Sequence, residues 1–432
     1  IDIDNGDRQF IRDSNLNYSN SPFDSCFIIN NSRGILRSEN SSSPPLVLLE
    51  STGSGVTNII NLVTMNDSSI DIENVSFDNT SDITLQNGVV GNNSRVIIKN
   101  SNSKQPNIIE SIMNFTNSDV VLEDSILLSN VNLIPVPQNP LYQGRTNVGL
   151  RNTNGNLTIR NFSTIGFKRS AIIAENCTYH FEDLNIRNNY DQLADVSGVF
   201  GLYPVSGISL YNAKGNMVDP RIISIVGEFG SDNSNEFLNG MAIYMKNSEA
   251  DILFTSDIVN TLYISNVCTA FYLQESRVKC SHTLSETYAI SDDVPPDASG
   301  NALFKHVVFG RNSDAILEFA NIQSATNVLL DTSLFDVQNG MLSLSDVTVV
   351  TGALSNQITA IQSENCKLDF NRLTIDSTQT SGIHQNTGEV IMNNCTIRNV
   401  SNVLEDATGV SIGNSNIQMN GIDVSGCVNG IY

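Results

Sequence analysis

The chain has 432 residues, of which 40% are hydrophobic and 16% charged, so it can bury a large core and does not belong to the disordered class. Its 45 acidic and 23 basic residues give a formal net charge of −22, which disfavours nucleic acid and polyanionic glycans as partners. The sequence has no apolar run long enough for a membrane span and no basic, apolar leader, so neither membrane insertion of this segment nor a signal peptide is predicted.

Residues 1–30 precede the first complete repeat and are predicted to form an N-terminal cap or a first coil. From there the sequence repeats one pattern, in which an Asn turn is followed by an apolar-x-apolar stretch, a polar pair and a second apolar-x-apolar stretch. "AENCTYHFEDLNI" from Ala174 and "SENCKLDFNRLTI" from Ser363 are two copies. The first apolar slot of each unit, called the anchor here, falls at Gly34, Ile70, Val96, Val120, Leu157, Tyr179, Gly215, Ala250, Val278, Ala315, Leu342, Leu368, Val390 and Ile417.

Most anchors are 22 to 28 residues apart, and a second alternating segment such as "GISLYN" or "AIYMKN" precedes each one. Alternation with a period of two indicates strands, and about 25 residues accommodate three short strands and three turns. The sequence therefore predicts an all-β chain, a single right-handed parallel β-helix of about 14 coils with three sheets, continuous over residues 1–432.

An asparagine stands three residues before the anchor in eleven of the fourteen units. Asparagine tolerates the left-handed turn conformation, and stacked amides can hydrogen-bond along a column. We therefore predict an Asn ladder at one turn of each coil. Its members are Asn31, Asn93, Asn117, Asn154, Asn176, Asn212, Asn247, Asn312, Asn339, Asn365 and Asn414.

This pattern resembles the pectin-lyase-like superfamily of right-handed parallel β-helices, with three sheets and an Asn-bearing turn. The resemblance covers nearly the whole chain and concerns architecture, because enzymes, phage tailspikes, adhesins and structural surface proteins share the fold. The Gly-His-Gly, Asp-Asp strand pair and Arg-x-Pro-x-x-Arg motifs of its better-known enzymes are absent. This absence favours a protein that is not an enzyme.

Four units are lengthened at one corner, by residues 129–146, 188–206, 227–240 and 285–301. Loops on a rigid scaffold are common binding sites, so we expect these insertions to lie side by side over one sheet. Acidic residues in them, Asp232, Glu236, Asp292, Asp293 and Asp297, are candidate Ca²⁺ ligands, although no ordered ligand spacing is present. No other cofactor or metal site is predicted.

Alternation places one outward row along the strand before the Asn turn, containing Asn114, Arg151, Ile173, Ser209, Tyr244, Tyr272, Phe309, Asp336, Gln362, His384 and Ser411. With the adjacent row it yields a candidate ligand-binding set of Arg151, Glu175, Tyr211, Tyr244, Lys246, Tyr272, Phe309 and Arg311. Aromatic rings flanked by cations suit sugar rings or a protein surface. A satellite core covered by the loops is the alternative.

Asp336 and Glu364 are the weak candidates for catalysis. They lie on neighbouring coils, two residues apart along the strand, which corresponds to the carboxylate separation of an inverting glycosidase. Any acidic sheet surface offers such pairs, so the catalytic residues stay unknown at this point.

Seven cysteines lack metal-binding spacing, and thirteen Asn-x-Ser/Thr sequons are potential glycan acceptors. The final "CVNGIY" aligns with Val267–Tyr272, so the chain ends on entering a fresh coil. We expect a segment of a longer protein, or a homo-oligomer or filament formed through uncapped ends.

The predicted function is that of a structural or adhesive β-helix (a stalk, adhesin or assembly subunit) on the outside of a cell or virion, contacting a glycan or a surface protein. The alternative is a polysaccharide-degrading hydrolase or lyase of the tailspike type.

Overall fold

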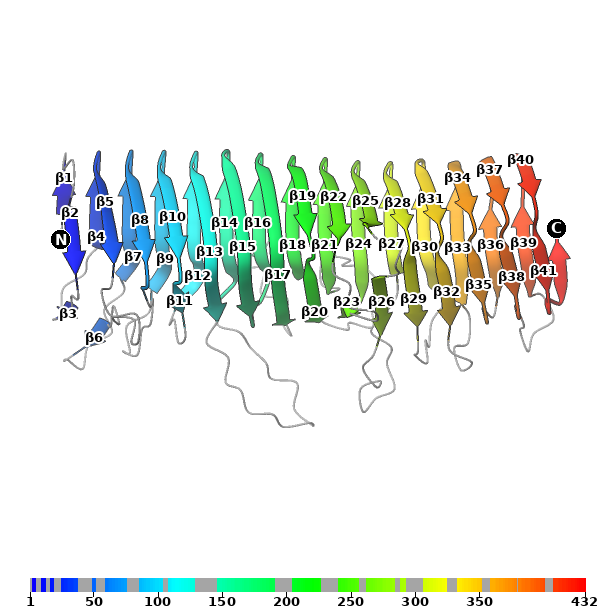
Figure 1. Cartoon of the computed structure of the whole chain (residues 1–432), viewed down its shortest axis with the longest axis horizontal. Coiled ribbons are helices and arrows are strands. Elements are labelled where there is room, and N and C mark those ends of the chain that lie inside the picture. The colour runs from blue at the N-terminus through cyan, green and yellow to red at the C-terminus, as the bar shows by residue number, and fades with distance from the viewer. Residues whose placement is uncertain are drawn as a thin grey trace. The chain divides into compact units, whose positions relative to one another are not determined.

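The computed structural model describes residues 2–4, 9–12, 16–18, 25–37, 49–51, 59–75, 85–103, 108–128, 146–190, 204–226, 240–255, 262–283, 288–292, 306–324, 332–351, 358–378, 380–400 and 407–432. The chain divides into two compact units. Unit 1 comprises Ile1–Gly215 and Gly227–Gly240, and unit 2 comprises Asn216–Val226 and Met241–Tyr432. Every regular element in the described ranges is a β-strand, as Figure 1 shows.

The first sheet of each unit is built from the strands that precede the Asn turn. In unit 1 these are β1 (Asp2–Asp4), β4 (Ser25–Asn30), β7 (Ile59–Asn66), β9 (Leu85–Asn92), β12 (Ile108–Thr116), β14 (Val148–Thr153), β16 (Ser170–Glu175) and β18 (Ser206–Tyr211). In unit 2 they are β21 (Met241–Lys246), β24 (Thr269–Gln274), β27 (His306–Arg311), β30 (Thr332–Gln338), β33 (Ile358–Glu364), β36 (Ser381–Gln385), β39 (Thr408–Ile412) and β42 (Asn429–Ile431).

The second sheet follows the Asn turn. In unit 1 it contains β2 (Gln9–Arg12), β5 (Arg33–Arg37), β8 (Ser69–Glu73), β10 (Arg95–Lys99), β13 (Asp119–Leu128), β15 (Asn156–Ile165) and β17 (Thr178–Tyr190). In unit 2 it contains β22 (Glu249–Phe254), β25 (Arg277–His282), β28 (Asp314–Glu318), β31 (Met341–Ser345), β34 (Cys366–Asn371), β37 (Gly388–Asn393) and β40 (Ser415–Asn420). The boundary between the units lies within β19 (Lys214–Val218).

A third sheet completes the coils of unit 2. Its strands are β20 (Arg221–Val226), β23 (Leu262–Val267), β26 (Tyr288–Asp292), β29 (Ala320–Ser324), β32 (Thr348–Thr351), β35 (Thr374–Asp376), β38 (Thr396–Arg398) and β41 (Asp423–Ser425). In unit 1, β13, β15 and β17 run on through the second turn into this position, and β11 (Asn102–Ser103) pairs with the end of β13. β3 (Leu16–Tyr18) and β6 (Leu49–Ser51) form a separate pair.

The anchors superpose as the repeat predicted. In unit 1 the register pairs run through Gly34, Ile70, Val96, Val120, Leu157 and Tyr179. In unit 2 they run through Ala250, Val278, Ala315, Leu342, Leu368, Val390 and Ile417. The pairing is parallel throughout and the crossovers are right-handed, as parallel connections almost always are. The predicted fold, a right-handed parallel β-helix, is therefore confirmed in both units.

Stacking of like residues builds the core. In the first sheet of unit 2, Ile243, Phe271, Val308, Phe335 and Ile361 occupy one column and are fully buried. Each such side chain contributes about 2 kcal/mol by leaving water. The apolar residues of the alternating pattern in the sequence are thus the residues that point into the core.

The Asn ladder is also confirmed. All eleven predicted asparagines have positive φ values, from 43° at Asn414 to 58° at Asn154. Where amides bond across coils, Asn154 donates to Asn117 at 3.2 Å, Asn212 to Asn176 at 3.0 Å and Asn365 to Asn339 at 3.0 Å. Asp67 and Glu275 take the same conformation in two of the remaining coils. Asparagine is favoured here because its short side chain tolerates this backbone.

A buried serine ladder, which the repeat pattern did not predict, follows the Asn ladder. Ser68 accepts a hydrogen bond from the Ser32 amide, Ser94 from Ser68 and Ser118 from Ser94, at 3.1 to 3.2 Å. Cys177 occupies the equivalent position in its own coil. Its thiol donates to the carbonyl of Glu175, two residues earlier, just as the Ser118 hydroxyl donates to the carbonyl of Thr116. Cys366 does the same toward Glu364. This explains the cysteine that "AENC" and "SENC" share.

Residues 2–4, 9–12 and 16–18 contribute strands that pair with β4, β5 and β6. Parts of the predicted corner insertions are regular strand, because residues 188–190 end β17 and residues 288–292 form β26 of the third sheet. The segment 285–301 is therefore not a loop over its whole length, as the sequence had predicted. Apart from these residues and from residues 146, 204–206 and 240, the insertions lie outside the described residues. Within the described ranges there is no helix of the length and apolarity that a membrane crossing requires.

Candidate functional site

The outer face of the first sheet in unit 2 carries the row predicted from alternation. Register pairing joins Tyr244, Tyr272, Phe309, Asp336, Gln362, His384 and Ser411 in that order. Each residue comes from a different strand, from β21 to β39. The repeat therefore located these side chains correctly relative to one another.

The three aromatic residues of this row stack on each other. The rings of Tyr244 and Tyr272 lie 5.5 Å apart and 18° from parallel, and those of Tyr272 and Phe309 lie 4.9 Å apart and 19° from parallel. Only 1% of Tyr244 and 4% of Tyr272 is exposed. Burial raises the pKa of the Tyr244 hydroxyl to about 12, so it stays neutral. The faces that a sugar ring would need are occupied by neighbouring rings.

The same face is apolar beside the stack. The outward residues two positions earlier, Ala242, Ala270, Val307, Leu334 and Ala360, are all buried. This burial favours the satellite-core interpretation for Tyr244 and Tyr272. A ligand surface on this sheet has to begin further along the row.

Arg311 ends the aromatic stack. Its guanidinium carbon lies 3.9 Å from the centre of the Phe309 ring, and Nη1 donates to Oδ1 of Asp336 at 2.8 Å. The side chains of Arg311 and Asp336 are 29% and 19% exposed. Lys246, the other predicted cation of unit 2, is exposed on β21. Arg311 thus links the aromatic part of the row to its polar part.

Three predicted ligand-binding residues belong to unit 1. Arg151 and Glu175 form an ion pair, with Nη2 of Arg151 2.8 Å from Oε2 of Glu175. Tyr211, half-buried, packs against the buried Val148 and Ile173. These contacts hold the three side chains on the unit 1 scaffold.

Beyond Arg311 the row becomes a shallow polar groove in unit 2 with a volume of about 110 Å³. The side chains that line it, called the polar strip here, are Asp336, Gln338, Gln362, Glu364, His384 and Asn386. Both candidate catalytic carboxylates belong to this strip, together with the outward histidine. Gln362, Glu364 and His384 are exposed.

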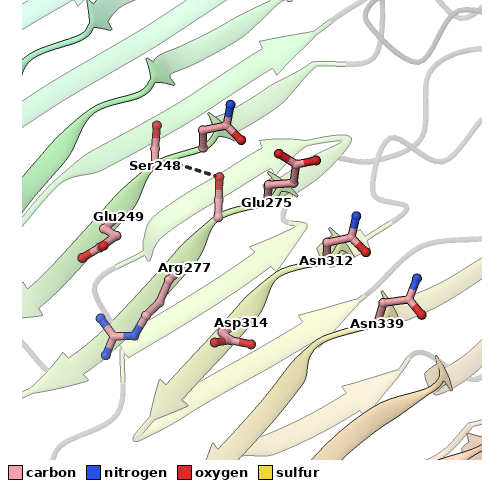
Figure 2. Close-up of a pocket in the computed structure, with 9 residues that line it drawn as sticks. Ser248, Glu249, Glu275, Arg277, Asn312, Asp314 and Asn339 are labelled. Carbon is pink, nitrogen blue, oxygen red and sulfur yellow. Dashed lines mark hydrogen bonds between the residues drawn. The ribbon is translucent and has the colours of Figure 1, made fainter.

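A second and wider depression, of about 390 Å³, lies over the Asn turn of unit 2. Figure 2 shows Glu275, Asn312 and Asn339 in one row along it, with Glu249, Arg277 and Asp314 beside them. Arg277 is paired with Asp251 at 3.3 Å, and one oxygen of Asp314 accepts the Met341 amide at 3.1 Å. The sequence pattern does not indicate this depression, because it predicts only a scaffold role for the turn residues.

No set of three or more ligand side chains suited to a metal ion occurs in the described ranges. Of the candidate Ca²⁺ ligands, Asp232, Glu236, Asp293 and Asp297 lie outside those ranges, and Asp292 ends β26. Calcium binding by the insertions therefore stays a prediction.

Comparison with protein-family profiles and with curated proteins gave no match. Among solved structures, the chain is similar to the catalytic unit of a thermostable GH87 α-1,3-glucanase from Streptomyces thermodiastaticus strain HF3-3, at 11% sequence identity and a TM-score of 0.27. The similarity covers 91% of this chain and 63% of the glucanase chain, so the present chain spans less than two thirds of that structure. A similarity at this level carries no argument about chemistry.

Proposed function

We propose that this chain is a non-catalytic structural protein of the pectin-lyase-like type, serving as a rigid stalk, adhesin or assembly subunit outside a cell or on a virion. The observation that carries the proposal is the mutual pairing, across coils, of the outward aromatic and charged side chains from Tyr244 to Asp336. The rings of Tyr272 and Phe309 stack on one another, and Arg311 holds Asp336. Side chains that bond to neighbouring coils in this way stabilise the scaffold and are not available to a substrate.

The size of the groove supports the same function. Sites that enclose a small-molecule substrate usually measure about 300 to 1,000 Å³. The groove containing Asp336 and Glu364 measures about 110 Å³. A ligand can therefore contact this groove from outside but cannot be enclosed by it. An acidic chain of net charge −22 is also suited to an aqueous exterior, with a glycan or a surface protein as partner.

The second candidate function is cleavage of a polysaccharide. The observation that favours it is that Asp336, Glu364 and His384 line one groove. Two carboxylates on the same groove are the minimum that general acid and base catalysis of glycoside hydrolysis needs. The two functions differ in one measurable outcome, the release of sugar.

The test is reducing-sugar release from a panel of neutral and acidic polysaccharides, with the full chain and with Asp336→Asn and Glu364→Gln. We expect no release above the buffer control with any of the three proteins. Glu389→Gln, an exposed carboxylate paired with Lys367 on the second sheet, is the matched control. Release that Glu389→Gln retains and both strip variants lose would establish the hydrolase instead.

A further inference from the structure

The polar strip differs from the rest of the row in its bonding. Asp336 is held by Arg311, and the aromatic residues hold one another. In the described part of the chain, no hydrogen bond or ion pair engages the side chains of Gln362, Glu364 or His384, which come from β33 and β36. Polar groups of three kinds therefore line one groove and remain available to a ligand.

We propose that the polar strip binds a neutral oligosaccharide whose hydroxyl groups bridge adjacent coils. This proposal rests on the proposed function of a non-catalytic scaffold and assigns a ligand class to it. A carboxylate such as Glu364 accepts hydrogen bonds from two neighbouring hydroxyls, and an amide such as Gln362 both donates and accepts. The two ring nitrogens of His384 add further hydrogen-bonding positions.

The spacing of the coils suits an extended sugar chain. Adjacent strands of a sheet lie about 4.8 Å apart, so β30, β33 and β36 present a polar group at each such step. An extended chain of pyranose rings advances by a similar distance per ring. One ring can therefore contact one coil, with Asp336, Gln362 and His384 at successive positions.

The charges of the strip select against acidic sugars. Asp336 and Glu364 are both carboxylates, and Arg311 beside the strip is paired with Asp336. Repulsion of uronic or sialic acids follows from this local charge and from the net charge of the chain. Uncharged hydroxyls meet no such repulsion.

A protein partner fits the strip less well than a sugar. The core of a protein interface is apolar and rich in aromatic residues. The large apolar side chains that are exposed in the described residues are Ile126, Val350, Ile417, Val428, Ile431 and Tyr432, and none of them lines the strip. The groove therefore offers hydrogen bonds without the apolar contact that a protein surface requires.

The experiment is calorimetric or NMR titration of the full chain with neutral gluco-, manno- and galacto-oligosaccharides and with oligogalacturonate. We expect binding of a neutral oligosaccharide that Gln362→Ala and His384→Ala each weaken about five- to tenfold, the effect of losing one hydrogen bond. Gln323→Ala, an exposed glutamine on β29, is the matched control and is expected to leave binding unchanged. Thermal melts of the variants check that each one folds.

Three results would overturn the site: no binding of any neutral oligosaccharide, binding that Gln362→Ala and His384→Ala leave intact, or tighter binding of oligogalacturonate. Failure of the site and failure of the scaffold function give different results. If the parent chain neither binds nor releases sugar, the proposed site is wrong while the scaffold function still holds. Sugar release that Asp336→Asn abolishes removes the non-catalytic function while leaving the oligosaccharide as the ligand class.

Discussion

At the scale of single residues, backbone conformation explains the most regular feature of the sequence. The position three residues before the anchor has a positive φ in every unit except that of Thr387, and this conformation costs most L-residues about 1 to 2 kcal/mol and asparagine less. Glu275 occupies this position with φ of 49° between Asn247 and Asn312. No side-chain hydrogen bond joins these three residues in the described structure. Glu275 is therefore a strained break in the ladder.

Replacing Glu275 with asparagine is expected to stabilise unit 2 by about 1 kcal/mol, because asparagine tolerates the left-handed conformation. Glu275→Ala is the control, since alanine has the same steric conflict as glutamate at this φ. The measurement is the free energy of unfolding in urea. Equal stability of the two variants would show that the backbone conformation at this position carries no such cost.

At the scale of elements, charged side chains on neighbouring strands hold coils in register. In the second sheet of unit 1, Glu123 on β13 lies 2.8 Å from Lys99 on β10 and 3.1 Å from Arg160 on β15. The hydrogen bond and the charge of Lys99, followed by the hydrogen bond and the charge of Arg160, lower the pKa of Glu123 below its ordinary value. The ionised carboxylate thus stabilises three successive coils.

Glu123→Gln is expected to destabilise unit 1 by about 0.5 to 1 kcal/mol at neutral pH, the range of a surface ion pair. A folded-state pKa below the unfolded value means that this stability is present above the unfolded pKa, near pH 4.3, and is lost as pH falls through the lowered folded value. The check is the unfolding free energy of parent and variant from pH 7 to pH 3. A difference that persists at pH 3, or that salt does not reduce, would contradict the ion-pair explanation.

At the scale of the whole molecule, each coil contacts chiefly its neighbours, and five of the cysteines lie inside the coils. Cys177, Cys268, Cys280, Cys366 and Cys395 are buried free thiols, whereas Cys427 is partly exposed. Burial raises the pKa of the Cys177, Cys280, Cys366 and Cys395 thiols. Little reactive thiolate is therefore present at these four positions in the folded protein.

Alkylation followed by peptide mass spectrometry is expected to modify Cys427 rapidly in the native protein and the buried thiols only in denaturant. Cys177 reports opening of unit 1 and Cys280 that of unit 2, so the order of labelling along a urea series shows which unit opens first. Native labelling of Cys280 at the rate of Cys427 would contradict the burial of this core.

Much of this architecture could be predicted from the sequence because a coil must match the coils above and below it. The same polarity therefore recurs at Ile243 and Phe271, and the same turn residue at Asn117 and Asn154. The repeat also predicted the register of Tyr244, Tyr272 and Phe309 correctly. The repeat pattern was sufficient to predict the fold and the register wherever equivalent positions of successive coils carry the same kind of residue.

Tertiary structure alone decided which of these aligned side chains remain available. Alternation shows that Tyr272 points outward, but its burial depends on packing against groups distant in sequence, and rings in register cover one another's faces. The hydrogen bond from Arg311 to Asp336 and the groove beside Gln362 and His384 likewise depend on side-chain reach across coils. The sequence by itself determined the scaffold, because that depends on repetition, whereas the candidate site depends on contacts that a repeat does not encode.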